Sequence, residues 1–158
     1  MFRKKPALPP HVSELGLEGA YLEPTAEGGV IVCACQGLFL FSDSELLESV
    51  PWVGIDHLSF GGKRELTITF SRVDVAPAVV RLESPDPRKF MDAARGYLED
   101  SVVLVRQRKT DSGTLLRGTV RRDSDGSLLL LVSAPNGGAV LDEEVDAFEA
   151  DLRELTNS

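Results

Sequence analysis

The chain of 158 residues has few of the side chains that build metal or redox centres, with two cysteines and two histidines. A structural zinc site needs four ligands, and His11 and His57 stand at no useful spacing from each other or from the cysteines. Cys33 and Cys35 are two residues apart. On a strand they point to the same face, which suits neither a relaxed disulfide nor a closed zinc site. We therefore expect no metal and two free thiols, which fit a reducing cytoplasm.

Long apolar runs are also missing. No window approaches 18 apolar residues, so we expect no membrane-spanning helix. Met1–Pro6 has positive charge but no apolar run behind it, which is unlike a signal peptide. Together with the free thiols, these observations predict a cytoplasmic protein. Peripheral contact with a membrane stays open, without a feature that supports it.

Positive charge is in short supply. There are 17 Lys and Arg against 25 Asp and Glu, and the net charge is −8. An acidic body is repelled by polyanions at long range, which argues against affinity of the whole protein for nucleic acid or anionic lipid.

The sequence departs from familiar catalytic and ligand-binding motifs at specific positions. A phosphate-binding loop ending at Gly62-Lys63 would need a glycine where His57 stands and Ser or Thr in place of Arg64. Asp123–Gly126 lacks the third acidic ligand and the closing Glu of a calcium loop, and no Gly-x-Ser-x-Gly is present. We expect no cofactor and no enzymatic activity.

What the sequence does contain is a series of short apolar runs separated by turn residues. Glu65–Phe70 shows the alternation of a half-buried strand most clearly, and Gly61-Gly62-Lys63 before it reads as a hairpin loop that two glycines permit. The runs predict seven strands, at residues 20–22, 30–34, 38–41, 46–50, 52–60, 65–70 and 78–82.

The period then changes to that of a helix over about residues 86–99, with apolar residues at i, i+3, i+4, i+7 and i+8 from Phe90. Three further strands are predicted at 102–109, 114–122 and 127–133. A final acidic helix is predicted over about 142–155, with one face lined by Leu141, Val145, Phe148, Leu152 and Leu155.

Seven short antiparallel strands followed by one helix resemble the pleckstrin-homology-like (PH-like) barrel. Leu38–Phe41 and the Val50-Pro51-Trp52-x-x-Ile55 step are similar to the bacterial branch of that superfamily, and Ser101–Arg106 through Arg121-Arg122 resemble small uncharacterised actinobacterial proteins. The resemblance implies an α+β fold, mostly antiparallel: a split barrel with a capping helix, a three-stranded extension and a C-terminal helix. The rival is another α+β domain with a large antiparallel sheet and both helices on one side.

The predicted organisation is a mobile tail over 1–17, a barrel with its helix over 18–100, and a β-β-β-α extension over 101–158 packed on the barrel as one structural unit. Lipid-binding members of the superfamily hold inositol phosphates with basic residues around the first hairpin loop. Here that loop, Glu23–Gly29, carries two acids and no base, which argues against inositide binding.

Charge is unevenly distributed. Between Val102 and Arg122 there are six Lys and Arg against Asp111 alone, whereas the final helix has seven acids against Arg153. If the two strands pair as a hairpin around Ser112-Gly113, alternation predicts a ladder of guanidinium groups on one side. The candidate partner-binding residues are Arg106, Arg108, Arg117, Arg121 and Arg122.

Three functions remain open. The leading one is a non-enzymatic interaction module that binds a protein, or a second copy of itself, through the basic hairpin and acidic helix. The second is a binder of an anionic ligand or polyanion through the same arginines, although no aromatic residue for base stacking lies between Val102 and Arg122. The third is an enzyme assembled from residues distant in sequence. A simpler reading is that the acidic helix pairs with its own strands.

Overall fold

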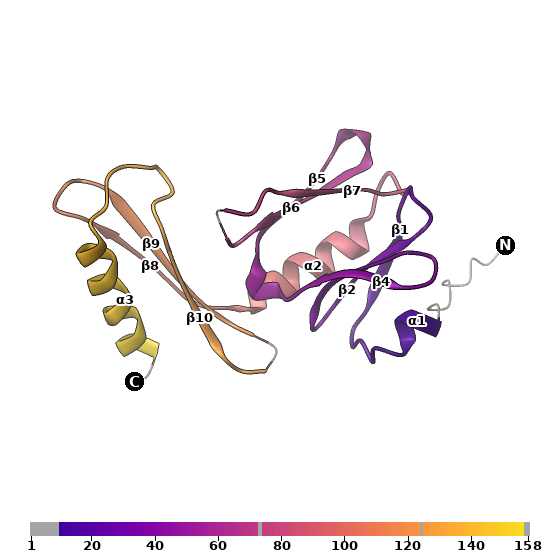
Figure 1. Ribbon diagram of the computed structural model, residues 1–158, viewed down its shortest axis with the longest axis horizontal. Helices are drawn as coiled ribbons and strands as arrows, with labels where there is room; N and C mark the ends of the chain where they lie inside the picture. Colours follow the sequence, from indigo (N-terminus) through magenta and orange to yellow (C-terminus); the bar gives the residue numbers. More distant parts are fainter. Residues whose placement is uncertain (1–9, 73, 124, 157–158) are drawn as a thin grey trace. The chain divides into compact units, whose positions relative to one another are not determined.

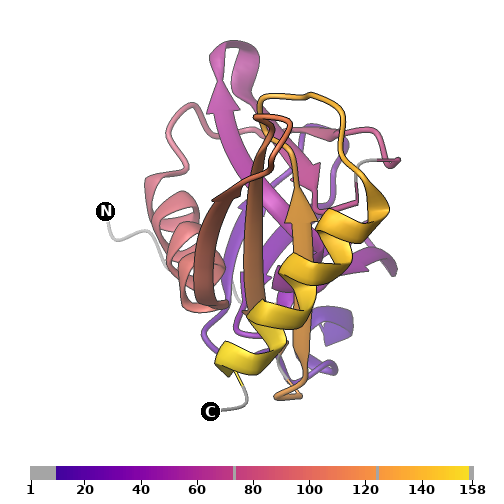
Figure 2. The same ribbon diagram turned by 90° about the vertical axis from the view of Figure 1, so that its left-hand side faces the viewer.

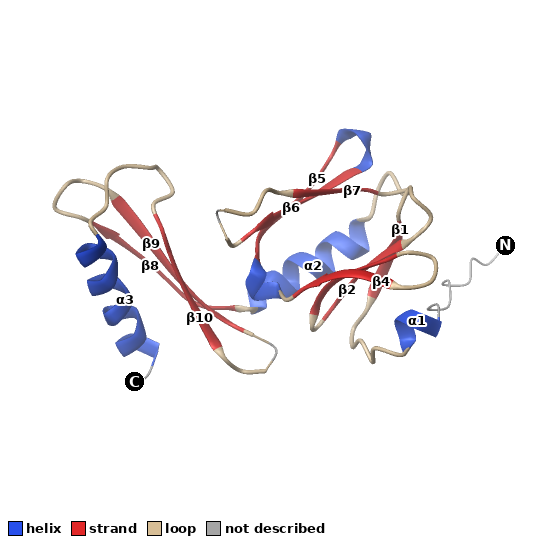
Figure 3. Ribbon diagram, in the orientation of Figure 1, coloured by secondary structure: helices blue, strands red, loops and turns tan. Residues whose placement is uncertain are grey.

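The computed structural model describes residues 10–72, 74–123 and 125–156. The chain divides between Tyr97 and Leu98 into two compact units, called unit 1 and unit 2 here. Antiparallel sheets dominate both units, and each unit also contains helical residues (Figures 1 and 3). The predicted α+β class with mostly antiparallel strands is confirmed.

Unit 1 contains two antiparallel sheets. The first has the order β1-β2-β3-β4 and the second β5-β6-β7, so each sheet is a meander of sequential strands. Helix α2 (Arg88–Asp100) follows these strands, so the elements come in the order of a PH-like fold. The strands are β1 (Tyr21–Pro24), β2 (Val30–Ala34), β3 (Gly37–Phe41), β4 (Leu46–Val50), β5 (Ile55–Gly61), β6 (Glu65–Phe70) and β7 (Ala78–Arg81).

A short 3₁₀ helix, η1 (Trp52–Gly54), turns the chain from the first sheet into the second. The strand predicted over 52–60 therefore begins three residues late, because Trp52 is used to anchor the corner. Its indole N–H donates to the carbonyl of Ala34 at 2.8 Å, and its ring stacks on that of Tyr97 with centroids 5.6 Å apart. At the opposite corner, a bridge between Thr25 and Leu82 joins the ends of β1 and β7.

Side chains of β2 alternate between two environments, as the pleat of a strand requires. The thiol of Cys33 donates to the carbonyl of Phe90 in α2 at 3.7 Å, on one face. On the other face, Val32 and Phe41 pack with Val12, which is fully buried.

Val12 belongs to helix α1 (Pro10–Ser13), in the segment where a mobile tail was expected over 1–17. Residues 1–9 lie outside the described part of the chain. Residues 10–17 form part of unit 1 instead, because Val12 and Leu17 pack on the outer face of the first sheet.

The connection between β5 and β6 differs in detail from its prediction. It forms a second 3₁₀ turn, η2 (Gly62–Arg64), in which Lys63 and Arg64 have φ of 69° and 59°. Gly61 has φ of −122°, so the left-handed backbone falls on the two basic residues and not on the glycines. Arg64 is held there because its carbonyl accepts from the Leu82 N–H at 2.8 Å and its guanidinium donates to the Glu83 carbonyl at 2.7 Å.

Unit 2 consists of β8 (Val102–Lys109), β9 (Leu115–Arg122), β10 (Leu128–Ser133) and helix α3 (Asp142–Thr156). The sheet order is β10-β9-β8, and Figure 2 shows α3 lying across one face of it. Phe148 and Leu152 of the predicted apolar stripe are buried, against Leu116 and Val120. The two ends of that stripe, Leu141 and Leu155, are exposed, so the buried stripe is shorter than predicted.

In the described part of the chain, no helix is both long enough and apolar enough to cross a membrane.

Candidate functional site

The hairpin formed by β8 and β9 is built as expected, but its arginines do not form one ladder. The strands pair with Arg106 opposite Gly118, Arg108 opposite Leu116, and Gln107 opposite Arg117. Directly paired residues of antiparallel strands point to the same face. Arg106 and Arg108 therefore share the face that α3 covers, while Arg117 points to the opposite face.

The turn decides this register. A turn centred between Ser112 and Gly113 would set Arg108 opposite Arg117. The actual turn has three residues between Thr110 and Thr114, with Gly113 at φ +89°. An odd loop of this kind, ending on a left-handed glycine, moves the pairing by one residue, and a shift of one residue sends every side chain of a strand to the other face.

Arg108 is the point at which the acidic helix meets the basic hairpin. Its guanidinium forms an ion pair with Asp151 and lies over the ring of Phe148, with 4.9 Å between Cζ and the ring centroid. Both charged side chains are about half exposed, so the pair contributes little stability by itself. The contact does confirm that the acidic helix pairs with its own strands at this position.

Arg121 lies in a different environment from the other candidates. It is 4% exposed, and its Nε and Nη2 donate to the hydroxyl of Ser101 at 3.0 and 2.7 Å. The main chain of Arg122 is fixed there as well, through a 2.7 Å bond from its N–H to the carbonyl of Ser101. Arg121 therefore holds the start of β8 against the end of β9 and is withdrawn from the surface on which it was predicted to lie.

The remaining cations of the hairpin are exposed. Arg106 bonds to the carbonyl of Val105, and Arg117 and Arg122 form no ion pair with any described residue. Lys109 stands beside Arg117 on the face that α3 does not cover, because it pairs with Leu115 in the same register. We call this surface the basic face of unit 2, defined by Lys109, Arg117, Val105, Leu129 and Leu131.

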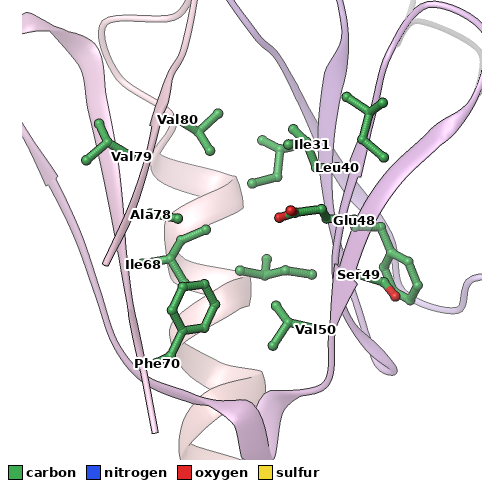
Figure 4. Close-up of a pocket in the computed structure, with 13 residues that line it drawn as sticks. Ile31, Leu40, Glu48, Ser49, Val50, Ile68, Phe70, Ala78, Val79 and Val80 are labelled. Carbon is green, nitrogen blue, oxygen red and sulfur yellow. The ribbon is translucent and has the colours of Figure 1, made fainter. Parts of the chain in front are cut away.

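Unit 1 contains a second candidate, an apolar groove of about 720 Å³ between its two sheets. Figure 4 shows side chains from β4 on one side and from β6 and β7 on the other pointing into it, with α2 behind. Among the residues that line the groove are Ile31, Leu40, Val50, Ile68, Phe70 and Val80. A volume of this size is in the range of small-molecule binding sites. The sequence did not reveal the groove, because nothing in its pattern distinguishes these residues from ordinary core positions.

Among the described residues, Glu48 is the one charged residue that lines this groove. It stands opposite Leu40 on the inner face of the first sheet, and its carboxylate points into the groove (Figure 4). The sequence did not identify Glu48 as a candidate site residue, because a carboxylate on a short strand is usually a solvated surface residue.

The two cysteines are free, as predicted. Cys33 is buried, and desolvation raises the pKa of its thiol from 9.0 to about 12. Cys35 follows the end of β2 and is exposed. Across residues 10–72, 74–123 and 125–156, His, Cys, Asp and Glu side chains do not gather in groups of three that could hold a metal ion.

No protein-family model and no curated protein matches the chain. Among solved structures, it is similar to the FERM and C-terminal domain complex of Drosophila Merlin, with a TM-score of 0.48 and 16% sequence identity. That match covers 56% of this chain and 32% of the other, so the chain spans about a third of the length of its structural neighbour.

Proposed function

We propose that the protein is a non-enzymatic interaction module that binds an acidic protein surface, or a second copy of itself, through the basic face of unit 2. The observation that carries the proposal is the position of Lys109 and Arg117 on the face of the sheet opposite α3. The seven acids of α3 stand on the other side, where Asp151 pairs with Arg108, so they leave these two cations to an external partner.

Apolar neighbours favour a protein partner over a polyanion. Val105 and Leu129 are 37% and 39% exposed on the same face as Arg117. A face that combines apolar area with a small number of cations is typical of a protein interface, whereas binding to nucleic acid depends on many phosphate contacts. We further propose that this module belongs to the bacterial branch of the PH-like superfamily. We also propose that it acts in the cytoplasm, where its two free thiols would remain reduced.

The test is affinity capture from the native cell with the full chain as bait, together with light scattering at low and high salt. The variant is Lys109→Glu with Arg117→Glu. The matched control is Lys89→Glu with Arg95→Glu, which makes the same charge change at exposed positions of α2. Arg121 is left intact because it is buried.

We expect the hairpin variant to lose a salt-sensitive complex or dimer that the control retains. A dimer of the wild-type chain would assign the partner as a second copy. The proposal would be contradicted if the wild type is a monomer at every salt concentration and if the wild type and the hairpin variant capture the same proteins. Binding of the wild type to a random DNA duplex with a steep salt dependence would also replace it.

A further inference from the structure

The groove of unit 1 lies beside a strand edge that has no partner. β4 is the last strand of its sheet and pairs only with β3. In the described residues, no backbone hydrogen bond leaves the other edge of Leu46–Val50. An edge of this kind presents a row of free N–H and C=O groups, which is a template for another strand.

The facing strand, β7, is less open. Its carbonyl at Arg81 accepts from the Ala26 N–H at 2.9 Å, and the next residue, Leu82, bridges to Thr25. One end of β7 is therefore already held by β1. Of the two strands that border the groove, β4 offers the longer run of unused backbone groups.

Large apolar side chains remain exposed on both borders. Leu47 of β4 is 52% exposed and Val79 of β7 is 57% exposed. Both residues line the groove, and both also line a smaller hollow near Gly29 and Arg81. Apolar area at the mouth of an apolar groove is a mark of a surface that another molecule covers.

We propose that this groove binds an extended segment of another protein, which adds to the edge of β4 as a new strand and places a Lys or Arg against Glu48. Neighbouring strands lie about 4.8 Å apart, so a residue directly opposite Glu48 on the added strand would point to the same inner face. That residue meets the one carboxylate among the described residues that line the groove, and a basic side chain is its complement.

The lining also sets the neighbours of the basic residue. Side chains of a strand that are two positions apart share a face, and the next inner residue of β4 after Glu48 is Val50. The bound segment therefore carries an apolar residue two positions from its Lys or Arg. β4 has five residues, which corresponds to about 17 Å of strand, so the recognised segment is about five to seven residues long.

Two other occupants fit less well. A fatty acid would fill the apolar groove, but its carboxylate would face Glu48 with like charge. A second copy of this chain is acidic, with a net charge of −8, and brings no complement to Glu48 by its overall charge. A peptide strand satisfies the free edge, the apolar lining and the carboxylate together.

The experiment uses the full chain, immobilised, and a displayed library of random nine-residue peptides as the probe. We expect enriched peptides to alternate apolar residues with others and to contain Lys or Arg two positions from an apolar residue. One enriched peptide is then synthesised with a fluorophore, and its dissociation constant is measured by fluorescence polarisation.

Three variants locate the binding. Ala78→Trp fills the groove from β7, and Glu48→Arg reverses its charge at an exposed position. Glu45→Arg makes the same charge change just outside β4, at a residue that does not line the groove. We expect the first two to weaken binding about tenfold or more, and Glu45→Arg to change it less than about twofold. A peptide with its Lys replaced by Glu should regain affinity for the Glu48→Arg variant.

Melting curves by circular dichroism establish whether each variant is folded. If the Ala78→Trp variant is unfolded, the test rests on the Glu48→Arg variant. The Lys109→Glu, Arg117→Glu variant should bind the peptide like the wild type, which separates this site from the basic face of unit 2. Failure to enrich any pattern, or equal binding by wild type, Glu48→Arg and every folded groove variant, would overturn the proposal. So would a lipid seen by native mass spectrometry, or a wild-type dimer, that the Glu48→Arg variant loses.

Discussion

Gly118 in β9 and Leu152 in α3 lie so close that a Cβ atom on the glycine would stand 2.3 Å from Cδ1 of the leucine. The same atom would lie 3.0 Å from Cζ of Phe148. The absence of a side chain at this position therefore sets how closely the acidic helix approaches its sheet, and with it the distance at which Asp151 reaches Arg108.

Gly118→Ala should destabilise unit 2 by about 1–3 kcal/mol, because the added methyl forces Leu152 and Phe148 out of their packed positions. Urea unfolding followed by circular dichroism measures the change. Gly96→Ala is the control with the opposite sign. Gly96 lies inside α2 with nothing within 4 Å of its added Cβ, so alanine should stabilise the chain by about 0.5–1 kcal/mol. Equal effects of the two substitutions would contradict the close approach of α3.

The two thiols should differ in reactivity. Cys33 is buried and its pKa is raised to about 12, so it has almost no thiolate at pH 8, whereas Cys35 is exposed. Iodoacetamide at pH 8 should modify one thiol of the native chain and both in urea, as read by peptide mass spectrometry. Cys35→Ser should abolish native labelling, and persistent labelling of that variant would show that Cys33 is accessible.

The ion pair between Arg108 and Asp151 should contribute only a small coupling energy. Because both side chains are about half exposed, a double-mutant cycle with Arg108→Ala and Asp151→Ala should give about 0.2–1 kcal/mol, and less in 1 M NaCl. Arg108→Ala alone should cost more than Asp151→Ala, since it also removes the contact with the ring of Phe148. A coupling above 2 kcal/mol, unchanged by salt, would mean that the pair is desolvated.

Truncating the side chain of Val12 should destabilise unit 1, although this residue lies near the start of the chain. Val12→Ala deletes two methyl groups that are fully buried against Val32 and Phe41, and the expected loss is about 2 kcal/mol. Leu15→Ala, three residues later at a side chain that is 45% exposed, should change stability by less than about 0.5 kcal/mol. If both variants melt at the wild-type temperature, residues 10–17 do not contribute to the packed unit.

Strands were predicted well because each carries its own local signal. Val30–Ala34, Leu46–Val50, Glu65–Phe70 and Val102–Lys109 begin and end at the expected residues, since β-branched or alternating apolar residues are bounded there by turn residues. Helix α1 was missed because its four residues, which begin with Pro10, are too few to show a period, and its burial depends on a sheet that is formed later in the chain.

The candidate site was predicted less well, because its geometry depends on register and not on composition. Alternation alone places Arg106 with Arg108, and Arg117 with Arg121, on common faces. Whether the two pairs meet depends on one residue of turn length at Gly113, which the pattern of the strands does not encode. The burial of Arg121 follows from Ser101, a partner 20 positions away at the end of α2. The groove around Glu48 arises only when two sheets are assembled.

Trp52 is the single tryptophan of the chain, and its indole stacks on Tyr97 in unit 1. Intrinsic fluorescence excited at the red edge of the absorption band therefore reports on unit 1 alone, while far-ultraviolet circular dichroism reports on the strands of both units. Superimposable transitions from the two signals would make the whole chain one cooperative folding unit. Separate transitions would give each unit its own melting temperature, read from a natural probe without any label.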